Sequence, residues 1–151
     1  MSLRLRPYTS KDQPACLALF DSNTPLFFSP AERPDFEHFL QHLPGPFFVV
    51  ESDGEIVGCG GYGRKGHNIL LTWGMVRRDQ HRQGIGTFLL QERLKHIAQE
   101  TPQAHIQIHT SQHTQPFFAR FGFRQTGFTP DAYAPGLHCV EMMLDLPLPQ
   151  P

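Results

Sequence analysis

The chain has 151 residues, 39% of them hydrophobic, and a formal net charge of −1. This length fits one domain better than two, and the apolar content is enough for a hydrophobic core. Lysine and arginine are scattered, which argues against nucleic-acid and membrane-surface binding, since both need clustered positive charge. The sequence shows no signal peptide and no apolar stretch long enough to span a membrane, so we expect a cytoplasmic protein.

Three cysteines, Cys16, Cys59 and Cys139, lie far apart in the sequence. Their number is odd and no Cys-x-x-Cys pair occurs, so neither a disulfide framework nor a cysteine metal site is expected. His105 and His109 share one face of an expected strand, but a two-histidine metal site without a carboxylate is improbable. We therefore expect a reducing compartment and no bound metal.

The first third of the chain predicts one strand and two helices. Alternating apolar and charged residues predict a half-buried strand over residues 3–6. Thr9 and Asp12 have the spacing of a capping box, which predicts a helix over residues 15–20. After a proline-containing loop, apolar residues at i, i+3, i+4 and i+7 predict a second helix over residues 31–43.

Pro44-Gly45-Pro46 breaks this helix, and three strands are expected after it. Strands over residues 47–51 and 56–62 flank a tight turn with Asp53-Gly54 at its centre, which is a hairpin signal. The second of these strands contains three glycines, which either weaken it or mark a bulge. The third strand, over residues 68–76, is apolar enough to be buried on both faces.

The rest of the chain alternates helices and strands. The longest helical pattern covers residues 84–100, and a strand over residues 105–110 follows it. A short helix begins after Thr114 and ends near Gly122, because glycine suits a helix C-terminus. The segments expected after this helix are strand 123–128, loop 129–137, strand 138–146 and a loose tail, 147–151.

The segments follow in the order β-α-α-β-β-β-α-β-α-β-β. Antiparallel hairpins come first and a parallel crossover around the long helix comes later, which predicts a mixed sheet of the α/β (α+β) class. No repeat or linker interrupts this order. We therefore interpret residues 1–146 as one domain, followed by the tail.

The segment Val76–Thr87 carries the clearest functional signal. A buried strand runs into a glycine-containing loop that opens the long helix, where free N–H groups and the helix dipole favour an anion such as pyrophosphate. Gly84 and Gly86 let the backbone approach phosphate oxygens, and Arg82 can add a charge-assisted contact. The segment lacks the third glycine of a dinucleotide fingerprint and the Gly-Lys-Ser/Thr of a P-loop. Glycines that merely close a turn are therefore the alternative.

Two motifs resemble the GNAT superfamily of acyl-CoA-dependent N-acyltransferases. The run His81-Arg82-Gln83-Gly84-Ile85-Gly86 is similar to the family signature Arg/Gln-x-x-Gly-x-Gly/Ala, which lies between the fourth strand and the third helix. It departs from the signature at His81. The run Phe118–Phe123 is similar to a family helix ending in Tyr-x-x-x-Gly-Phe, with Phe118 in the Tyr place. The order of elements also fits the family across nearly the whole chain.

The resemblance implies a GNAT fold, a mixed and mostly antiparallel sheet of about seven strands, splayed between strands 4 and 5 and flanked by about four helices. It also implies acetyl-CoA as co-substrate, with its pantetheine arm in the splay along the backbone of Met75 and Val76. The thioester carbonyl would accept a hydrogen bond near Gly74 or Met75. The residues implied in CoA binding are Met75, Val76, His81, Arg82, Gln83, Gly84, Ile85, Gly86, Thr87 and Phe118.

By the same resemblance an amine attacks the thioester directly, so the protein positions the substrates and removes a proton. Phe118 has no proton for the departing thiolate; Ser111 is the nearest hydroxyl by motif spacing, and simply ending a strand is its alternative role. His109 is the first candidate base, because the ordinary histidine pKa suits proton removal near pH 7. A solvated histidine at a strand edge is the alternative. Glu32 and Glu141 are further candidates, and a water chain can replace a single base.

Residues 24–39 and 129–138 are expected to form the acceptor groove, as in the family. Their aromatic residues and few charges suit a small amine with an apolar part, while an ordinary core role for the phenylalanines is the alternative. We therefore expect an acetyltransferase acting on the primary amine of a small molecule. The alternatives are a non-catalytic acyl-CoA-binding sensor or interaction module, and a nucleotide or sugar-phosphate binder. A homodimer stays open, because relatives often form dimers.

Overall fold

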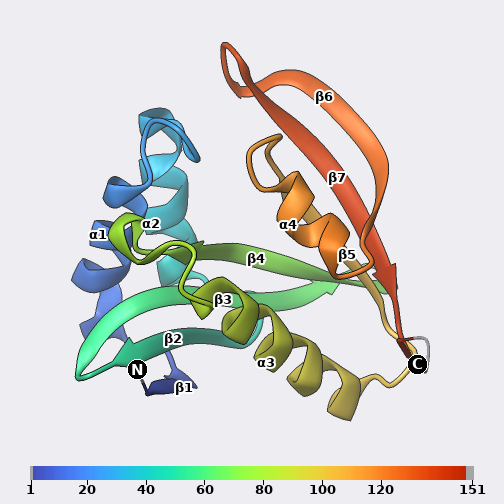
Figure 1. Ribbon diagram of the computed structural model, residues 1–151, viewed down its shortest axis with the longest axis horizontal. Coiled ribbons are helices and arrows are strands. Elements are labelled where there is room, and N and C mark those ends of the chain that lie inside the picture. Colours follow the sequence, from blue (N-terminus) through green and yellow to red (C-terminus); the bar gives the residue numbers. More distant parts are fainter. Residues whose placement is uncertain (1, 149–151) are drawn as a thin grey trace.

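A seven-stranded mixed sheet forms the centre of the molecule, in the strand order β1-β2-β3-β4-β5-β7-β6 (Figure 1). The computed structural model describes residues 2–148. The strands are β1 Leu3–Pro7, β2 Phe47–Ser52, β3 Glu55–Lys65, β4 Asn68–Val76, β5 His105–Thr110, β6 Arg124–Ala134 and β7 Leu137–Asp145. The helices are α1 Gln13–Ser22, α2 Arg33–Gln41, α3 Ile85–Glu100 and α4 Gln115–Arg120, with short 3-10 turns η1 Ser10–Asp12, η2 Pro30–Glu32 and η3 Arg78–Gln80.

The pairing of β4 with β5 is parallel, and the other strand pairs of residues 2–148 are antiparallel. Parallel neighbours need a long crossover, because a short turn cannot return the chain to the same end of the sheet. The helix α3 is that crossover. The mixed sheet, the parallel β4–β5 pair and the flanking helices confirm the GNAT fold expected from the sequence.

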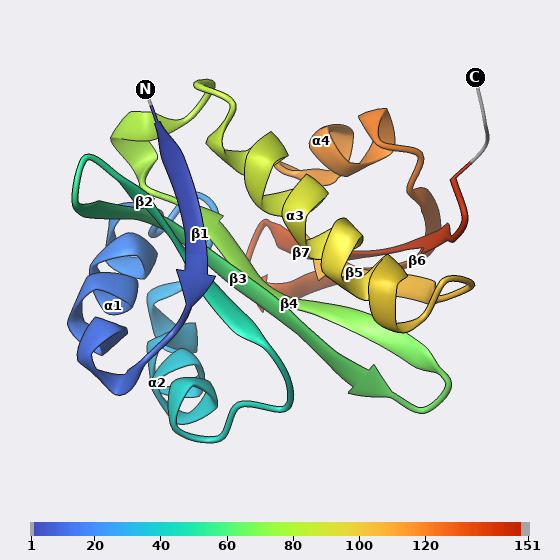
Figure 2. The same ribbon diagram turned by 90° about the horizontal axis from the view of Figure 1, so that it is seen from below.

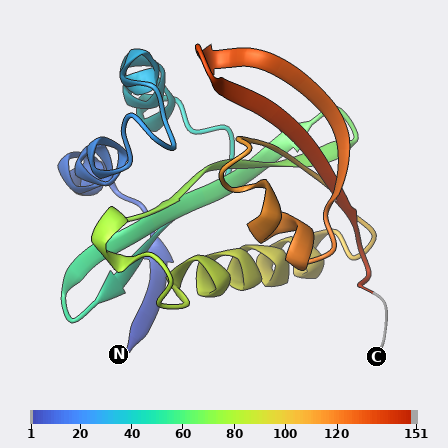
Figure 3. The ribbon, with the colours of Figure 1, turned by 45° about the horizontal axis from the view of Figure 1, so that its top comes forward.

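Helices cover both faces of the sheet. The helices α1 and α2 lie on one face and α3 crosses the other, as the views from below and from the top edge show (Figures 2 and 3). Phe20 and Phe36 bury the first interface, and Leu90 and Ile97 of α3 bury the second together with Ile106 of β5. Because β2, β3 and β4 are covered on both sides, their sequences are nearly continuous apolar runs.

The strands β4 and β5 touch at one end only. Ile69 pairs with Ile106 and Leu70 pairs with Gln107, and beyond these residues the two strands diverge (Figure 1). Among residues 2–148, no strand lies beside the β5-facing edge of β4 from residue 71 onward. This opening is the splay that the family resemblance implied.

The prediction of a loop over residues 129–137 is wrong. The strand β6 continues to Ala134 and pairs with β7 as far as Leu137. Of the two prolines in this stretch, only Pro130 lies in β6, which is the outer strand of the sheet, where proline is tolerated. A register shift between Thr129 and Ala134, with Asp131 at φ 53°, absorbs the irregularity.

Other boundaries move by a few residues. The strand β3 extends beyond the expected residue 62 to Lys65, and α2 ends at Gln41 and follows the 3-10 turn η2. The predicted capping box is present, because the Thr9 N–H donates to the Asp12 carboxylate at 2.8 Å.

The C-terminal end of the described chain lies beside α3. Pro147 and Leu148 line a shallow hollow with Leu94 and Ala98 of that helix. Residues 149–151 of the expected tail lie outside the described residues. None of the described helices is both long and apolar enough to cross a membrane.

Candidate active site

A cleft of about 940 Å³ occupies the opening between β4 and β5. Its walls come from β4, β5, the loop before α3, the first turn of α3, and α4. The loop between α1 and α2 forms one side of its mouth, where the ring of Phe27 lies 5.2 Å from His81 and 6.0 Å from His113. Elements distant in sequence therefore meet at the splay.

The N-terminus of α3 presents backbone donors to this cleft. The first helical hydrogen bond runs from the Phe88 N–H to the Gly84 carbonyl at 3.0 Å, so the N–H groups of Ile85, Gly86 and Thr87 precede the helical ladder. Gly84 has φ 82°, which glycine adopts without strain. With the helix dipole, these donors form a site for an anion.

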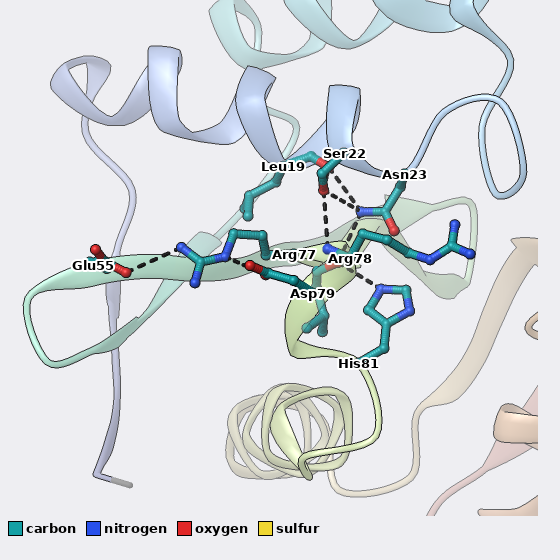
Figure 4. Close-up of polar contacts among 9 residues, drawn as sticks. Leu19, Ser22, Asn23, Glu55, Arg77, Arg78, Asp79 and His81 are labelled. Atoms are coloured by element: carbon teal, nitrogen blue, oxygen red, sulfur yellow. Dashed lines mark hydrogen bonds and ion pairs between the residues drawn. The ribbon is translucent and has the colours of Figure 1, made fainter.

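Two side chains hold the loop before α3 against the end of β4 (Figure 4). The carbonyl oxygen of Val76 accepts a hydrogen bond from Asn23 Nδ2 at 2.9 Å and lies 2.9 Å from His81 Nε2. Asn23 Nδ2 also donates to the Leu19 carbonyl at 2.8 Å. His81 therefore stabilises the loop through its side chain.

The register of β3 and β4 shows which peptide groups face the opening. The Arg77 N–H donates to the Val57 carbonyl at 2.8 Å, and Met75 pairs with Cys59. Antiparallel alternation then turns the peptide groups of Met75 toward β3 and those of Val76 toward the opening. Since the Val76 carbonyl already contacts Asn23 and His81, its N–H is the group left for a ligand in the opening.

A bulge interrupts β4 in the middle of the cleft wall. The register shifts between Cys59 and Gly61 of β3, and Trp73 of β4 has φ 41°. The extra residue bends the strand and leaves Gly74 exposed at the cleft. The backbone at Gly74 is therefore accessible to a ligand.

On the α4 side of the cleft, Phe118 has no proton to donate. Phe118 is buried and packs edge-on against Phe117 and Phe123. Ser111 is 4% exposed, and its Oγ accepts a hydrogen bond from the His113 N–H at 3.3 Å. Ser111 thus lines the cleft and also stabilises the turn before α4.

His109 lies on the cleft wall formed by β5. Its Nε2 is 3.0 Å from Gln107 Nε2 and 3.3 Å from Glu141 Oε1. Burial lowers the pKa of His109, Lys65 lowers it further, and Glu141 raises it. His109 is therefore mostly neutral at pH 7 and has a nitrogen that can accept a proton.

Aromatic and acidic groups line the mouth on the α1–α2 side. The ring of Trp73 stacks on that of Phe36, with 4.8 Å between the ring centroids, and its centroid lies 6.0 Å from that of Phe28. Trp73 therefore belongs both to the core and to the cleft wall. Burial raises the pKa of the Glu32 carboxyl and also that of the Tyr133 hydroxyl. This wall offers an apolar surface with one carboxylate.

The sequence agrees with this geometry. Residues 32–146 match the profile of the acetyltransferase (GNAT) domain. The chain belongs to the GNAT acetyltransferase family. No curated protein sequence matches it.

Solved GNAT structures share the fold at low sequence identity. Ard1 from Thermoplasma volcanium superposes with a TM-score of 0.82 at 14% identity, over 98% of this chain and 100% of that one. The ribosomal-protein-S18-alanine N-acetyltransferase from Escherichia coli superposes with a TM-score of 0.81 at 15% identity, over 99% of this chain and 97% of that one. A GNAT acetyltransferase from Elizabethkingia anophelis, solved with acetyl-CoA bound, gives 0.75 at 14% identity, over 95% and 98%.

Most of the residues that the sequence singled out meet in the GNAT cleft. The predicted residues that line it are Met75, Val76, His81, Arg82, Gly84, Gly86, Thr87, His109, Ser111 and Phe118. The side chains of Gln83 and Ile85 do not line it, and Ile85 is 1% exposed in the core. Sequence reasoning missed Asn23 and Arg93, whose roles depend on contacts between distant segments.

Proposed function

We propose that this GNAT protein transfers an acetyl group from acetyl-CoA to the primary amine of a small molecule with an apolar part. The observation that carries the proposal is the splay itself, which joins two unlike surfaces. One end meets the backbone donors of α3, which suit a pyrophosphate. The other end meets an aromatic wall with the Glu32 carboxylate, which suits an ammonium with an apolar body.

Backbone groups of β4 would orient the thioester. The Val76 N–H faces the opening and can pair with the pantetheine arm. The N–H at Gly74, on the exposed bulge, can donate to the thioester carbonyl oxygen, where negative charge develops during attack. The acetyl-CoA bound in the Elizabethkingia anophelis structure supports this assignment of the co-substrate.

The transfer is a direct displacement in which His109 accepts the proton. The amine nitrogen bonds to the carbonyl carbon, and the π electrons move to oxygen. As the carbonyl re-forms, the C–S bond breaks and its electron pair leaves with the thiolate. A bound ammonium loses one proton to solvent before it attacks. His109 Nε2 takes the second proton, which the nitrogen releases as the amide forms, and the neighbouring Glu141 stabilises the resulting imidazolium.

A thermal-shift measurement followed by a turnover measurement tests the proposal. Acetyl-CoA should raise the unfolding temperature by an amount that grows with the logarithm of its concentration relative to Kd. Free CoA thiol should then appear when a panel of small primary amines is added, and aromatic or aliphatic amines should react faster than strongly polar ones. No shift at millimolar acetyl-CoA would refute the assignment of the co-substrate.

Phe118 and the capping contact of Ser111 favour one second candidate, a non-catalytic acyl-CoA sensor. Phe118 has no proton for the leaving thiolate, and Ser111 already stabilises the turn before α4. This candidate predicts the same thermal shift with acetyl-CoA, but no thiol release with any amine. Turnover with a single amine would eliminate it.

A further inference from the structure

Arg93, on the inner side of α3, is a buried cation that lines the cleft. It is 2% exposed. A methyl group built on Gly74 would come within 2.9 Å of its Nη2, and one built on Gly60 would come within 3.3 Å of its Cζ. The guanidinium therefore fills the space of the missing side chains at Gly60 and Gly74, against the bulge of β4.

The guanidinium has few partners. Its Nη1 donates to the Gly61 carbonyl at 3.3 Å, and its buried Nε has no hydrogen-bond partner among residues 2–148. Cys59, beside Gly60 on β3, supplies no negative charge, because burial raises the pKa of its thiol well above the ordinary value. Burial lowers the pKa of Arg93 to about 10, so the guanidinium is charged at neutral pH.

A buried charge without a counter-charge destabilises a fold, and an apolar side chain of similar size would fill the same space at lower cost. The folded protein alone gives no reason for a cation here. A ligand that brings negative charge to the cleft would give this cation a partner. Gly74 is the residue that the guanidinium contacts at the cleft wall.

We propose that Arg93 is the fixed positive charge that stabilises the negative charge developing on the thioester carbonyl oxygen during acyl transfer. This inference rests on the proposed function, which places that oxygen beside Gly74 on the open side of β4. The Arg93 guanidinium packs against Gly74 in the space that a Cβ would occupy, 2.9 Å from Nη2. Solvent is excluded around Arg93, so its field is weakly screened.

Because Phe118 stands where the family has a tyrosine, a positive charge near the thioester has a second role. Phe118 lines the cleft on α4 and has no proton to give to the departing thiolate. A nearby guanidinium stabilises both the tetrahedral oxyanion and the thiolate, and it does so without giving up a proton.

Infrared spectroscopy of bound acetyl-CoA labelled with ¹³C at the carbonyl tests this role, and it needs no acceptor amine. A cation beside the carbonyl lowers its stretching frequency. Arg93→Met should therefore return the bound frequency toward the value of free acetyl-CoA, and Arg93→Lys should give an intermediate value. Lys95→Met removes an exposed cation from the same helix and should leave the frequency unchanged.

Kinetics with a reactive amine give the second measurement. Arg93→Met should lower kcat about 10²-fold, as the loss of an oxyanion donor does, with a much smaller change in acetyl-CoA affinity. If Arg93→Met does not fold, Arg93→Lys carries both comparisons. An unchanged frequency and kcat in a folded variant that binds acetyl-CoA would overturn the role of Arg93 and leave the proposed function standing. A wild-type protein that does not bind acetyl-CoA would overturn both.

Discussion

The side-chain amide of Asn23 donates a hydrogen bond of 2.9 Å to the carbonyl of Val76, which lies 53 residues further along the chain. This contact joins the C-terminal end of α1 to the last residue of β4, next to the loop that opens α3. It connects the layer that forms the acceptor wall with the segment that carries the anion site. The Arg78 N–H donates to Ser22 Oγ at 3.1 Å beside it, so two contacts from the end of α1 join the two halves of the cleft (Figure 4).

Asn23→Ala should destabilise the protein by about 1–3 kcal/mol, because it leaves buried carbonyl groups of Val76 and Leu19 with fewer donors. Urea denaturation measures this change. Thr24→Ala is the control, because the Thr24 hydroxyl bonds the Asp21 carbonyl at an exposed site and its loss should change stability by about 0.5 kcal/mol or less. Equal effects of the two substitutions would contradict the positioning role of Asn23.

Asp12→Asn should lower stability at pH 7 by roughly 2 kcal/mol, because the Asp12 carboxylate accepts two hydrogen bonds of 2.8 Å from Arg6. The Arg6 guanidinium lowers the pKa of Asp12 below its ordinary value of 3.8. The stabilisation is therefore complete at pH values well above 3.8 and is lost as the pH falls through the lowered pKa. Denaturation at pH 7 and at a series of acid pH values should show a large difference that shrinks as the pH falls.

The matched control for Asp12 is Asp21, which also makes a two-point contact with an arginine, Arg33, but at an exposed site. Asp21→Asn should lower the free energy of unfolding by about 1 kcal/mol or less, because solvent screens exposed ion pairs. A larger effect for Asp21→Asn than for Asp12→Asn would contradict the argument from burial.

Local patterns in the sequence were enough to predict most strands and helices and to indicate an anion site at α3, whereas the splay was implied by the family resemblance. The family signature around Gly84 lies in consecutive residues, and the strands and helices follow from periodicity. Asn23 and Arg93 could not be predicted in this way. The role of Asn23 needs the position of α1 against β4, and that of Arg93 needs the register that sets Gly60 beside Gly74. The sequence signal for Arg93 is an arginine within the apolar pattern of the long helix, together with the glycines of the neighbouring strands.

The length of β6 was missed for a related reason. Proline disfavours an inner strand, but the penalty disappears at an outer edge, and edge position is a property of the whole sheet.

Gly84→Asp should reduce CoA affinity by at least about 100-fold, since it places a carboxylate beside the backbone donors of α3. The control is Gly84→Asn, which has nearly the same shape and also tolerates the observed φ of 82°. No atom lies within 4 Å of a Cβ built at this position, so both variants should fold. Calorimetric titration with CoA gives the comparison. If Gly84→Asp and Gly84→Asn reduce the affinity for CoA equally, the anion site lies elsewhere.

The pH dependence of kcat/KM should report His109. As a base it acts when neutral, so the rate should rise with pH through its pKa, which burial places below the ordinary value of 6.5. Glu141→Gln should move this inflection to lower pH, because Glu141 raises the pKa of His109. His109→Gln should remove the inflection and lower kcat/KM about 10²-fold. His105→Gln, on the same strand but paired with Asp145, should leave the profile unchanged. An acid limb that survives His109→Gln would assign the proton to another group.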